Sequence, residues 1–419
     1  MKLRVVGLFL IPVALAVAQA PKPDSCTDCH SVMEGAIQAP AIAYKADIHA
    51  AAGITCADCH GGNPAVSDPE GAMNRAKGFI GKPARTAIPK LCSNCHSNAD
   101  YMGKHKPQQR VDQFAQYQTS VHGKRLAAGD TNVATCVDCH SVHNIRGVRD
   151  ALSPVHPVNL PDTCGHCHAD AGKMSQYGIP TNQHADYKTS VHWSALKDRG
   201  DLSAPNCASC HGNHGAKPPG AESVTAVCAN CHVMFGQLFS KSVHQPVFSE
   251  GGGCTVCHSN HAIKQPSTAM LKGKDAVCAT CHDAGTPGAK AAEEIAGLLD
   301  GLAGNLDQSR EALAKADRYG MEVSEAQLKL AEGHESLIKA RLTLHSFQVE
   351  EVRKTVAPGM KIASETRTAG ENALREKDFR RIGLGISVLF IALTVIAIAV
   401  LLRRMESRSN NHEEGKQTL

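Results

Sequence analysis

The stretch Cys136-Val137-Asp138-Cys139-His140-Ser141-Val142-His143 carries the pattern that decides the fold of this chain. Two cysteines separated by two residues are followed at once by a histidine, and a second histidine comes three residues later. Two thiols on one side of a tight turn can add to the vinyl groups of a haem, and the adjacent imidazole then binds the iron as its proximal ligand. The stretch therefore predicts a covalent haem c site.

The same C-x-x-C-H pattern accounts for all 18 cysteines of the chain. A disulfide framework or zinc sites could also use an even number of cysteines, but neither requires a histidine directly after each pair. We therefore expect nine covalently attached haem c groups. The attaching cysteines are Cys26, Cys29, Cys56, Cys59, Cys92, Cys95, Cys136, Cys139, Cys164, Cys167, Cys207, Cys210, Cys228, Cys231, Cys254, Cys257, Cys278 and Cys281. The proximal iron ligands are His30, His60, His96, His140, His168, His211, His232, His258 and His282.

Four internal repeats organise these motifs. Each repeat opens with an aromatic residue five positions before a histidine, and two C-x-x-C-H motifs follow. We number the repeats 1 to 4; they open at Tyr44, Tyr117, Tyr187 and Phe239, and the corresponding histidines are His49, His122, His192 and His244. Their first motifs start at Cys56, Cys136, Cys207 and Cys254, and their second motifs at Cys92, Cys164, Cys228 and Cys278. The motif at Cys26 stands alone.

Histidines outside the motifs are candidates for the second axial position of each iron. Repeats 2 to 4 place one three residues after the first proximal histidine, and so close a residue cannot reach the opposite face of the same haem. We expect it to bind a neighbouring haem, which would hold adjacent porphyrins in contact. The expected distal ligands are His49, His122, His143, His192, His214, His244 and His261. Met33 could be a thioether ligand or a packing residue, and His105, His156 and His184 have no support from the repeats.

Both ends of the chain predict export and a membrane anchor. Basic residues precede an apolar run and a small-residue site, so residues 1–20 are expected to be a signal peptide. Residues 382–402 contain no charge and are long enough to cross a bilayer as one helix. We expect the haem domain to lie at the periplasmic face of the cytoplasmic membrane, with residues 403–419 as a cytoplasmic tail.

The segment between the last motif and the membrane helix predicts a helical hairpin. Apolar residues recur every three or four positions from Ile295 to Ala316 and again from Ile338 to Val356. We expect Gly320 to end the first helix and Pro358-Gly359 to interrupt the second. His345 falls on the second apolar seam, with His334 nearby, and a buried, hydrogen-bonded histidine is favoured there over a haem ligand.

The predicted fold is mostly α with much irregular loop. A haem-packed cytochrome domain covers residues 21–285, a helical hairpin or stalk covers 286–381, and one transmembrane helix follows. Aromatic residues make up only 4% of the chain, so porphyrins are expected to supply the missing apolar bulk. The net charge of +4 gives no electrostatic footprint for nucleic acid.

The chain resembles the multihaem c-type cytochromes with paired C-x-x-C-H motifs, and among them the octahaem group related to hydroxylamine oxidoreductase. The residues that carry the resemblance are the C-x-x-C-H-x-x-H elements ending at His143, His214 and His261, and the Ser-Val-His segments at His122, His192 and His244. The resemblance implies electron carriage between redox proteins or the quinol pool and a soluble acceptor. The alternative is an oxidoreductase of small nitrogen or sulfur compounds with one open haem. The hairpin is a possible contact between copies of the chain.

Overall fold

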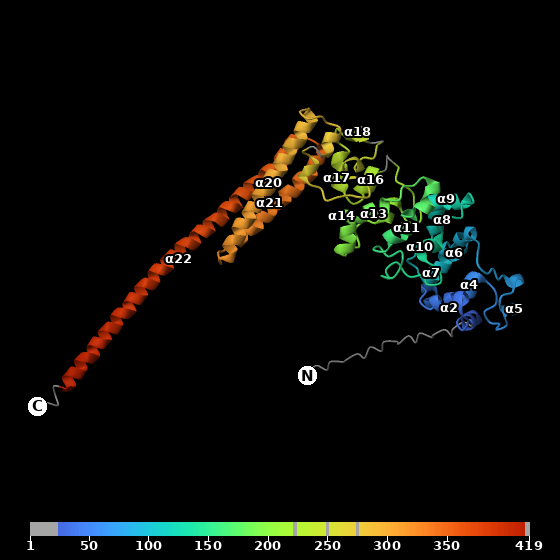
Figure 1. Cartoon of the computed structure of the whole chain (residues 1–419), viewed down its shortest axis with the longest axis horizontal. Coiled ribbons are helices and arrows are strands. Elements are labelled where there is room, and N and C mark those ends of the chain that lie inside the picture. The colour runs from blue at the N-terminus through green and yellow to red at the C-terminus, as the bar shows by residue number, and fades with distance from the viewer. Residues whose placement is uncertain (1–23, 221–223, 249–250, 274–275, 415–419) are drawn as a thin grey trace, which may run out of the picture. The chain divides into compact units, whose positions relative to one another are not determined.

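The computed structural model describes residues 24–220, 224–248, 251–273 and 276–414 (Figure 1). Within these ranges the chain forms helices joined by irregular segments, and no strand occurs there. The mostly α fold with much loop is therefore confirmed. The predicted signal peptide at residues 1–20 lies outside the described residues.

The chain divides into two compact bodies. The first comprises residues 1–220 and 259–264, and the second comprises 221–258 and 265–419. The second body therefore joins parts of repeats 3 and 4 to the helical C-terminal region.

Short helices dominate the cytochrome part of both bodies. In the first body they are α1 (Ser25–His30), α2 (Gln38–Tyr44), α3 (Ile48–Ala51), α4 (Cys56–His60), α5 (Pro69–Ala72), α6 (Ile88–His96), α7 (Ala99–His105), α8 (Gln113–Thr119), α9 (Val121–Ala127), α10 (Cys136–His140), α11 (Leu160–His168), α12 (Ala171–Met174), α13 (Gln183–Lys188), α14 (Val191–Trp193) and α15 (Cys207–His211). In the second body they are α16 (Val224–Ala229), α17 (Val233–Phe239), α18 (Gln245–Phe248) and α19 (Thr255–His258). Single turns of other helix types, η1 (Gly35–Ile37), η2 (Arg75–Lys77), η3 (Arg85–Ala87), η4 (Ser175–Tyr177), η5 (Ser194–Asp198), η7 (Thr268–Met270) and η8 (Val277–Thr280), link them.

The polypeptide of the first body has almost no apolar core of its own. Among its described residues, the only cluster of buried apolar side chains consists of Ala195, Leu196 and Ala204, with Val158 packed against it. A chain of this length normally buries a much larger core, because conformational entropy must be offset by apolar burial. The fold of this body therefore depends on apolar material other than its side chains.

The second body has a core that its side chains do fill. Helices α20 (Pro287–Arg318), α21 (Ser324–Thr343) and the first part of α22 (Val349–Glu414) lie side by side (Figure 1). The predicted seam of the first helix is confirmed at every position, since Ile295, Leu299, Leu302, Leu306, Ser309, Leu313 and Ala316 are all buried. We call this three-helix packing the bundle.

The second predicted seam is wrong in two respects. Ile338 is exposed, because α21 buries Leu337 and Ala340 instead. The helix break falls between α21 and α22, where the single turn η9 (Leu344–Ser346) precedes Phe347 with a φ of 56°. Pro358 lies inside α22 and does not interrupt it.

Packing on both sides of Pro358 explains why the helix continues. A proline inside a helix costs about 3 kcal/mol, because one hydrogen bond is lost and the ring meets a carbonyl. Val352, Val356 and Ala363 flank it and are buried against the other two helices. A Cβ at Gly359 would lie 2.8 Å from Cβ of Ser336, so the Pro-Gly pair permits a close helix approach.

The last part of α22 is the one segment among the described residues that is long and apolar enough to cross a membrane. It contains the predicted span 382–402, whose large side chains are exposed along its length. The helix fits a membrane anchor. It is continuous with the bundle, so the anchor and the bundle share one helix.

Replacing Leu302 by alanine should destabilise the bundle by about 2 to 5 kcal/mol, because the side chain is fully buried and its loss leaves a cavity. Guanidinium unfolding followed by far-ultraviolet circular dichroism would measure the change. Leu328→Ala is the matched control, since that leucine is 72% exposed. Equal effects of the two substitutions would contradict the packing described here.

Candidate haem ligand sites

The first haem motifs of repeats 1 to 3 are short helices with the same cap. Thr55, Thr135 and Asn206 begin capping boxes whose third helical residues are Asp58, Asp138 and Ser209. Each box satisfies free backbone N–H groups at the helix start. Helices α4, α10 and α15 each begin at the first cysteine of the motif and end at the proximal histidine. The two cysteines and the imidazole therefore belong to one short helix.

The residue directly after the first proximal histidine has a positive φ in all four repeats. These residues are Gly61 (69°), Ser141 (62°), Gly212 (79°) and Ser259 (64°). The left-handed backbone turns the chain sharply away from the motif helix. In repeats 2 to 4, the histidine three residues after the proximal one is thereby directed away from its own motif.

All three of these directed histidines face the first proximal histidine of the preceding repeat. The ring centroids are 5.9 Å apart for His60 and His143, 6.1 Å for His140 and His214, and 6.0 Å for His211 and His261. The planes of the rings are close to parallel, with angles of 24°, 10° and 7° respectively. The prediction that these histidines lie at a neighbouring motif agrees with this arrangement.

A backbone hydrogen bond fixes each of these junctions between repeats. In each case the backbone N–H of the residue just before a repeat's opening histidine is the donor. The acceptor is the carbonyl of the residue two positions after the directed histidine. The three bonds run from Ile48 to Ile145 (2.8 Å), from Val121 to Ala216 (3.0 Å) and from Val191 to Ile263 (2.8 Å). The register between successive repeats is therefore the same at all three junctions.

The histidines that open the repeats face the second motifs of the same repeats. Ring centroids are 5.9 Å apart for His49 and His96, 6.2 Å for His122 and His168, and 6.1 Å for His244 and His282. Here the planes are steeply inclined, at 79°, 62° and 80°. Two kinds of pair thus alternate along the repeats: near-parallel pairs at first motifs and steeply inclined pairs at second motifs.

Buried polar side chains hold the opening histidines in place. The side chain two positions before each opening histidine accepts a hydrogen bond from a backbone N–H at or near the start of the following helix. The four bonds are Asp47 from His49 N, Ser120 from Gly123 N, Ser190 from Trp193 N and Ser242 from His244 N. All four capping side chains are buried. His192 thus sits in the same capped position as His49 and His122.

The aromatic residues that open repeats 2 and 3 connect them to their own first motifs. The Tyr117 hydroxyl donates to the Ala134 carbonyl, and the Tyr187 hydroxyl donates to the Pro205 carbonyl, each at 2.8 Å. Both carbonyls lie two residues before the first cysteine of a motif. The repeated aromatic residue therefore positions the attachment site.

Burial favours the neutral form of nine of the paired imidazoles. It lowers the pKa of His140 to about 4, with a smaller contribution from the neighbouring His214 ring. Burial likewise lowers the pKa of His96, His122, His143, His168, His214, His244, His258 and His261. A neutral imidazole is the form that binds a metal.

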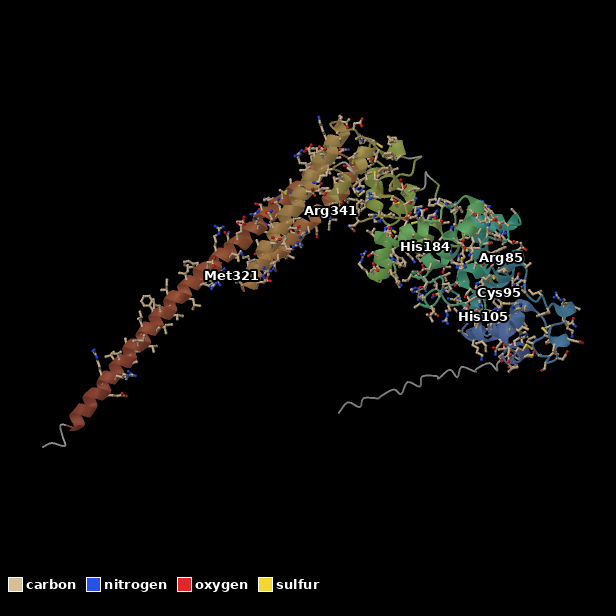
Figure 2. All side chains as sticks on the ribbon, viewed as in Figure 1. Arg85, Cys95, His105, His184, Met321 and Arg341 are labelled. Atoms are coloured by element: carbon tan, nitrogen blue, oxygen red, sulfur yellow. The ribbon has the colours of Figure 1, made fainter. Side chains whose placement is uncertain are left out.

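Attaching cysteines of successive repeats meet side by side. The Cys92 side chain contacts Cys136, Cys164 contacts Cys207, and Cys228 contacts Cys254. The second motif of one repeat therefore lies next to the first motif of the following repeat. At the first junction Arg85, which Figure 2 labels near Cys95, adds hydrogen bonds of 2.8 Å to both Asp138 and the Val133 carbonyl.

The other histidines that the sequence left open contact side chains or backbone atoms nearby. His184, labelled in Figure 2, pairs with Asp162 at 2.9 Å. His105 packs on the Tyr101 ring at 4.6 Å, and His156 accepts a hydrogen bond from Val158 N. His30, the predicted proximal ligand of the Cys26 motif, places Nδ1 3.4 Å from the Ile37 carbonyl oxygen. Met33 is exposed.

Sequence reasoning missed one pair. His345, from η9, lies 6.1 Å from His258 between ring centroids, with an angle of 19° between the planes. The helical periodicity that places residue 345 on an apolar seam could not reveal this contact, because the two histidines are far apart in the chain.

The residues present fit haem c. A metal–imidazole bond is about 2 Å long, so two imidazoles on opposite sides of one iron have ring centres about 6 Å apart. The seven pairs have this separation, and each includes the histidine of a C-x-x-C-H motif. Porphyrins would also supply the apolar bulk that the first body lacks. When bound, haem supplies one-electron redox chemistry.

Comparison with known protein families agrees with this geometry. Residues 48–169 match the family described as cytochrome c3, and residues 244–286 match the family described as a doubled CXXCH motif. No curated protein and no solved structure was found to match the chain.

The motifs and these two matched segments are consistent with a multihaem c-type cytochrome, a class of protein that transfers electrons. Its C-x-x-C-H motifs indicate covalently bound haem c. The two matched segments are similar to the cytochrome c3 and doubled-motif families, and the octahaem resemblance stays a prediction.

Ser141→Gly should stabilise the protein, because Ser141 has φ 62° and ψ −174°, a conformation that only glycine adopts readily. Relief of strain, less the entropy cost of glycine, should gain about 1 kcal/mol. The midpoint of thermal unfolding should rise by about 2 to 4 °C.

Ser97→Gly is the matched control, since Ser97 also follows a proximal histidine but has an ordinary φ of −106°. It should not raise the midpoint. A gain in the control equal to that of Ser141→Gly would contradict the role of the left-handed turn.

Proposed function

We propose that this chain is a membrane-anchored periplasmic cytochrome with nine haems. It would pass electrons along the haem chain between a membrane partner or the quinol pool and a soluble acceptor. The observation that carries the proposal is the set of seven pairs of facing histidine rings, 5.9 to 6.2 Å apart, among the residues that the structure describes. An iron with two histidine ligands transfers electrons but has no position for a substrate.

The connections between repeats support transfer from haem to haem. His140 would belong to one haem and His143 faces the proximal ligand of another, yet only two residues separate them. Their Cα atoms are therefore at most about 10 Å apart. The contacts between Cys92 and Cys136, and between Cys164 and Cys207, bring further haem attachment points together. Short separations of this kind are what electron tunnelling requires.

The apolar part of α22 supports the membrane anchor. Covalent attachment of haem c takes place outside the cytoplasmic membrane, so we propose that the cytochrome part lies on the periplasmic face. The tail from residue 403 would then be cytoplasmic. We further propose that copies of the chain contact one another through the bundle.

One observation favours the alternative, an oxidoreductase of small nitrogen or sulfur compounds. Within the described residues, no imidazole faces His30 as one faces the proximal histidines of the seven pairs. If the Cys26 haem is open on its distal side, it is the place where such a compound would bind.

Electron paramagnetic resonance of the oxidised protein tests the carrier function against the alternative. The carrier should show predominantly low-spin ferric iron that nitrite and hydroxylamine leave unchanged. A substantial high-spin signal that shifts when either compound is added would favour the enzyme instead.

The same spectrum should contain two low-spin populations. Parallel imidazole planes split the iron d orbitals strongly and give a rhombic signal, whereas perpendicular planes leave two orbitals nearly degenerate and give a highly anisotropic one. Four pairs are near-parallel and three are steeply inclined. A single rhombic population would contradict the ring geometry.

The haem count is tested by mass spectrometry of the mature protein. We expect nine haem additions on the polypeptide. The double variant Cys136→Ala, Cys139→Ala should carry one haem fewer, and loss of several haems would show that attachment is not independent. A wild-type count below nine would contradict the proposed load.

A further inference from the structure

The pairing of histidines between successive repeats leaves the first proximal histidine of repeat 4 without a following repeat to supply its partner. In repeats 1 to 3, the first proximal histidine faces a histidine that the following repeat supplies: His143, His214 and His261. Repeat 4 is the last, and the sequence after its second motif contains no further cysteine. Its first proximal histidine, His258, therefore needs a partner from outside the repeats.

The helical region supplies a ring in the equivalent position. His345 lies 6.1 Å from His258 with a plane angle of 19°, which falls within the range of the other three near-parallel pairs. The match extends to orientation as well as distance. A histidine that merely filled a gap in the bundle would have no reason to reproduce both values.

A hydrogen bond orients the His345 ring. Its Nδ1 lies 3.2 Å from the Leu342 carbonyl, and a protonated Nδ1 would donate to that oxygen. Histidines that bind a metal commonly donate their second N–H to a backbone carbonyl, which fixes the tautomer and leaves Nε2 free for the metal. The edge-on Phe235 ring, 4.9 Å away, confines the imidazole further.

The break between α21 and α22 places two side chains against histidines of repeat 4. The turn η9 presents His345 to His258, and Phe347, two residues later, packs on the His244 ring at a centroid distance of 4.1 Å. In an uninterrupted helix these two side chains, two residues apart, would point to nearly opposite sides of the helix axis. The left-handed φ of Phe347 thus has a use that helical periodicity alone does not suggest.

We propose that His345 is the distal iron ligand of the haem attached at Cys254 and Cys257. The bundle takes the place that a fifth repeat would occupy and closes the series of shared ligands. One iron would then join the cytochrome part of the second body to the helix that carries the membrane span. This inference rests on the proposed haem at that motif.

The test replaces His345 by alanine in the full-length haem-loaded protein. We expect about one ninth of the ferric iron to change from low-spin to high-spin in the paramagnetic resonance spectrum, with the loss confined to the rhombic population. Added imidazole should restore the low-spin signal. His334→Ala is the matched control, because His334 lies on α21 of the same bundle and makes no ring contact among the described residues. It should leave the spectrum unchanged.

A spectrum of His345→Ala that equals the wild-type spectrum would overturn the assignment. If the alanine variant fails to accumulate, His345→Met decides the matter, because a thioether ligand should give the charge-transfer band of histidine–methionine ligation and raise the potential of one haem. If the methionine variant folds and carries its haems but shows neither the charge-transfer band nor a raised potential, the assignment is also overturned.

Peptide mass spectrometry separates this outcome from failure of the proposed function. Absence of haem from the peptide with Cys254 and Cys257 would refute the nine-haem proposal. Haem present on that peptide, with an unaltered spectrum in both His345 variants, would refute only the role of His345.

Discussion

An iron that takes one histidine from each of two repeats makes the order of one repeat depend on the next. Repeat 1 places His60 opposite His143 of repeat 2, and repeat 2 places His140 opposite His214 of repeat 3. Binding of metal to a site that the unfolded chain lacks contributes directly to folding. The first body has few buried apolar side chains, so on the proposed ligation the shared ligands and the porphyrins around them would replace a conventional core.

The backbone after the proximal histidine makes this sharing possible. A residue three positions along a continuing helix would lie on nearly the same side as the proximal ligand. The positive φ at Gly61, Ser141, Gly212 and Ser259 ends the helix at that point and sends the chain outward. Two of these residues are serines, which shows that the conformation is kept even where the side chain makes it costly.

The sequence was a reliable guide wherever the chemistry is local. The C-x-x-C-H motifs, the four repeats and the aromatic residues that open them can all be read from spacing, and the structure places His143, His214 and His261 at neighbouring motifs as expected. The seam from Ile295 to Ala316 was also predictable, because helical periodicity reports burial directly.

The wrong or missing sequence predictions concern residues whose behaviour is decided by tertiary contacts and not by local sequence rules. Pro358 predicts a helix break, but burial of Val352 and Val356 against the bundle outweighs the cost of the proline. His345 looks like an ordinary seam residue, because its partner is almost ninety positions away in the chain. The angle between two imidazole planes has no counterpart in any one-dimensional pattern.

The helix that bears the anchor also limits what the last paired haem can do. On the proposed ligation, His345 lies just before Val349, where α22 begins, and the apolar span starts at Ile382. An α-helix rises about 1.5 Å per residue, so about 50 Å of helix separates the two points. Tunnelling across such a length is negligible, and a quinol within the bilayer cannot reduce this haem directly if α22 stands upright. This haem would then exchange electrons with a protein that extends well beyond the membrane surface, and direct exchange with quinol would require another haem of the chain or a tilted helix.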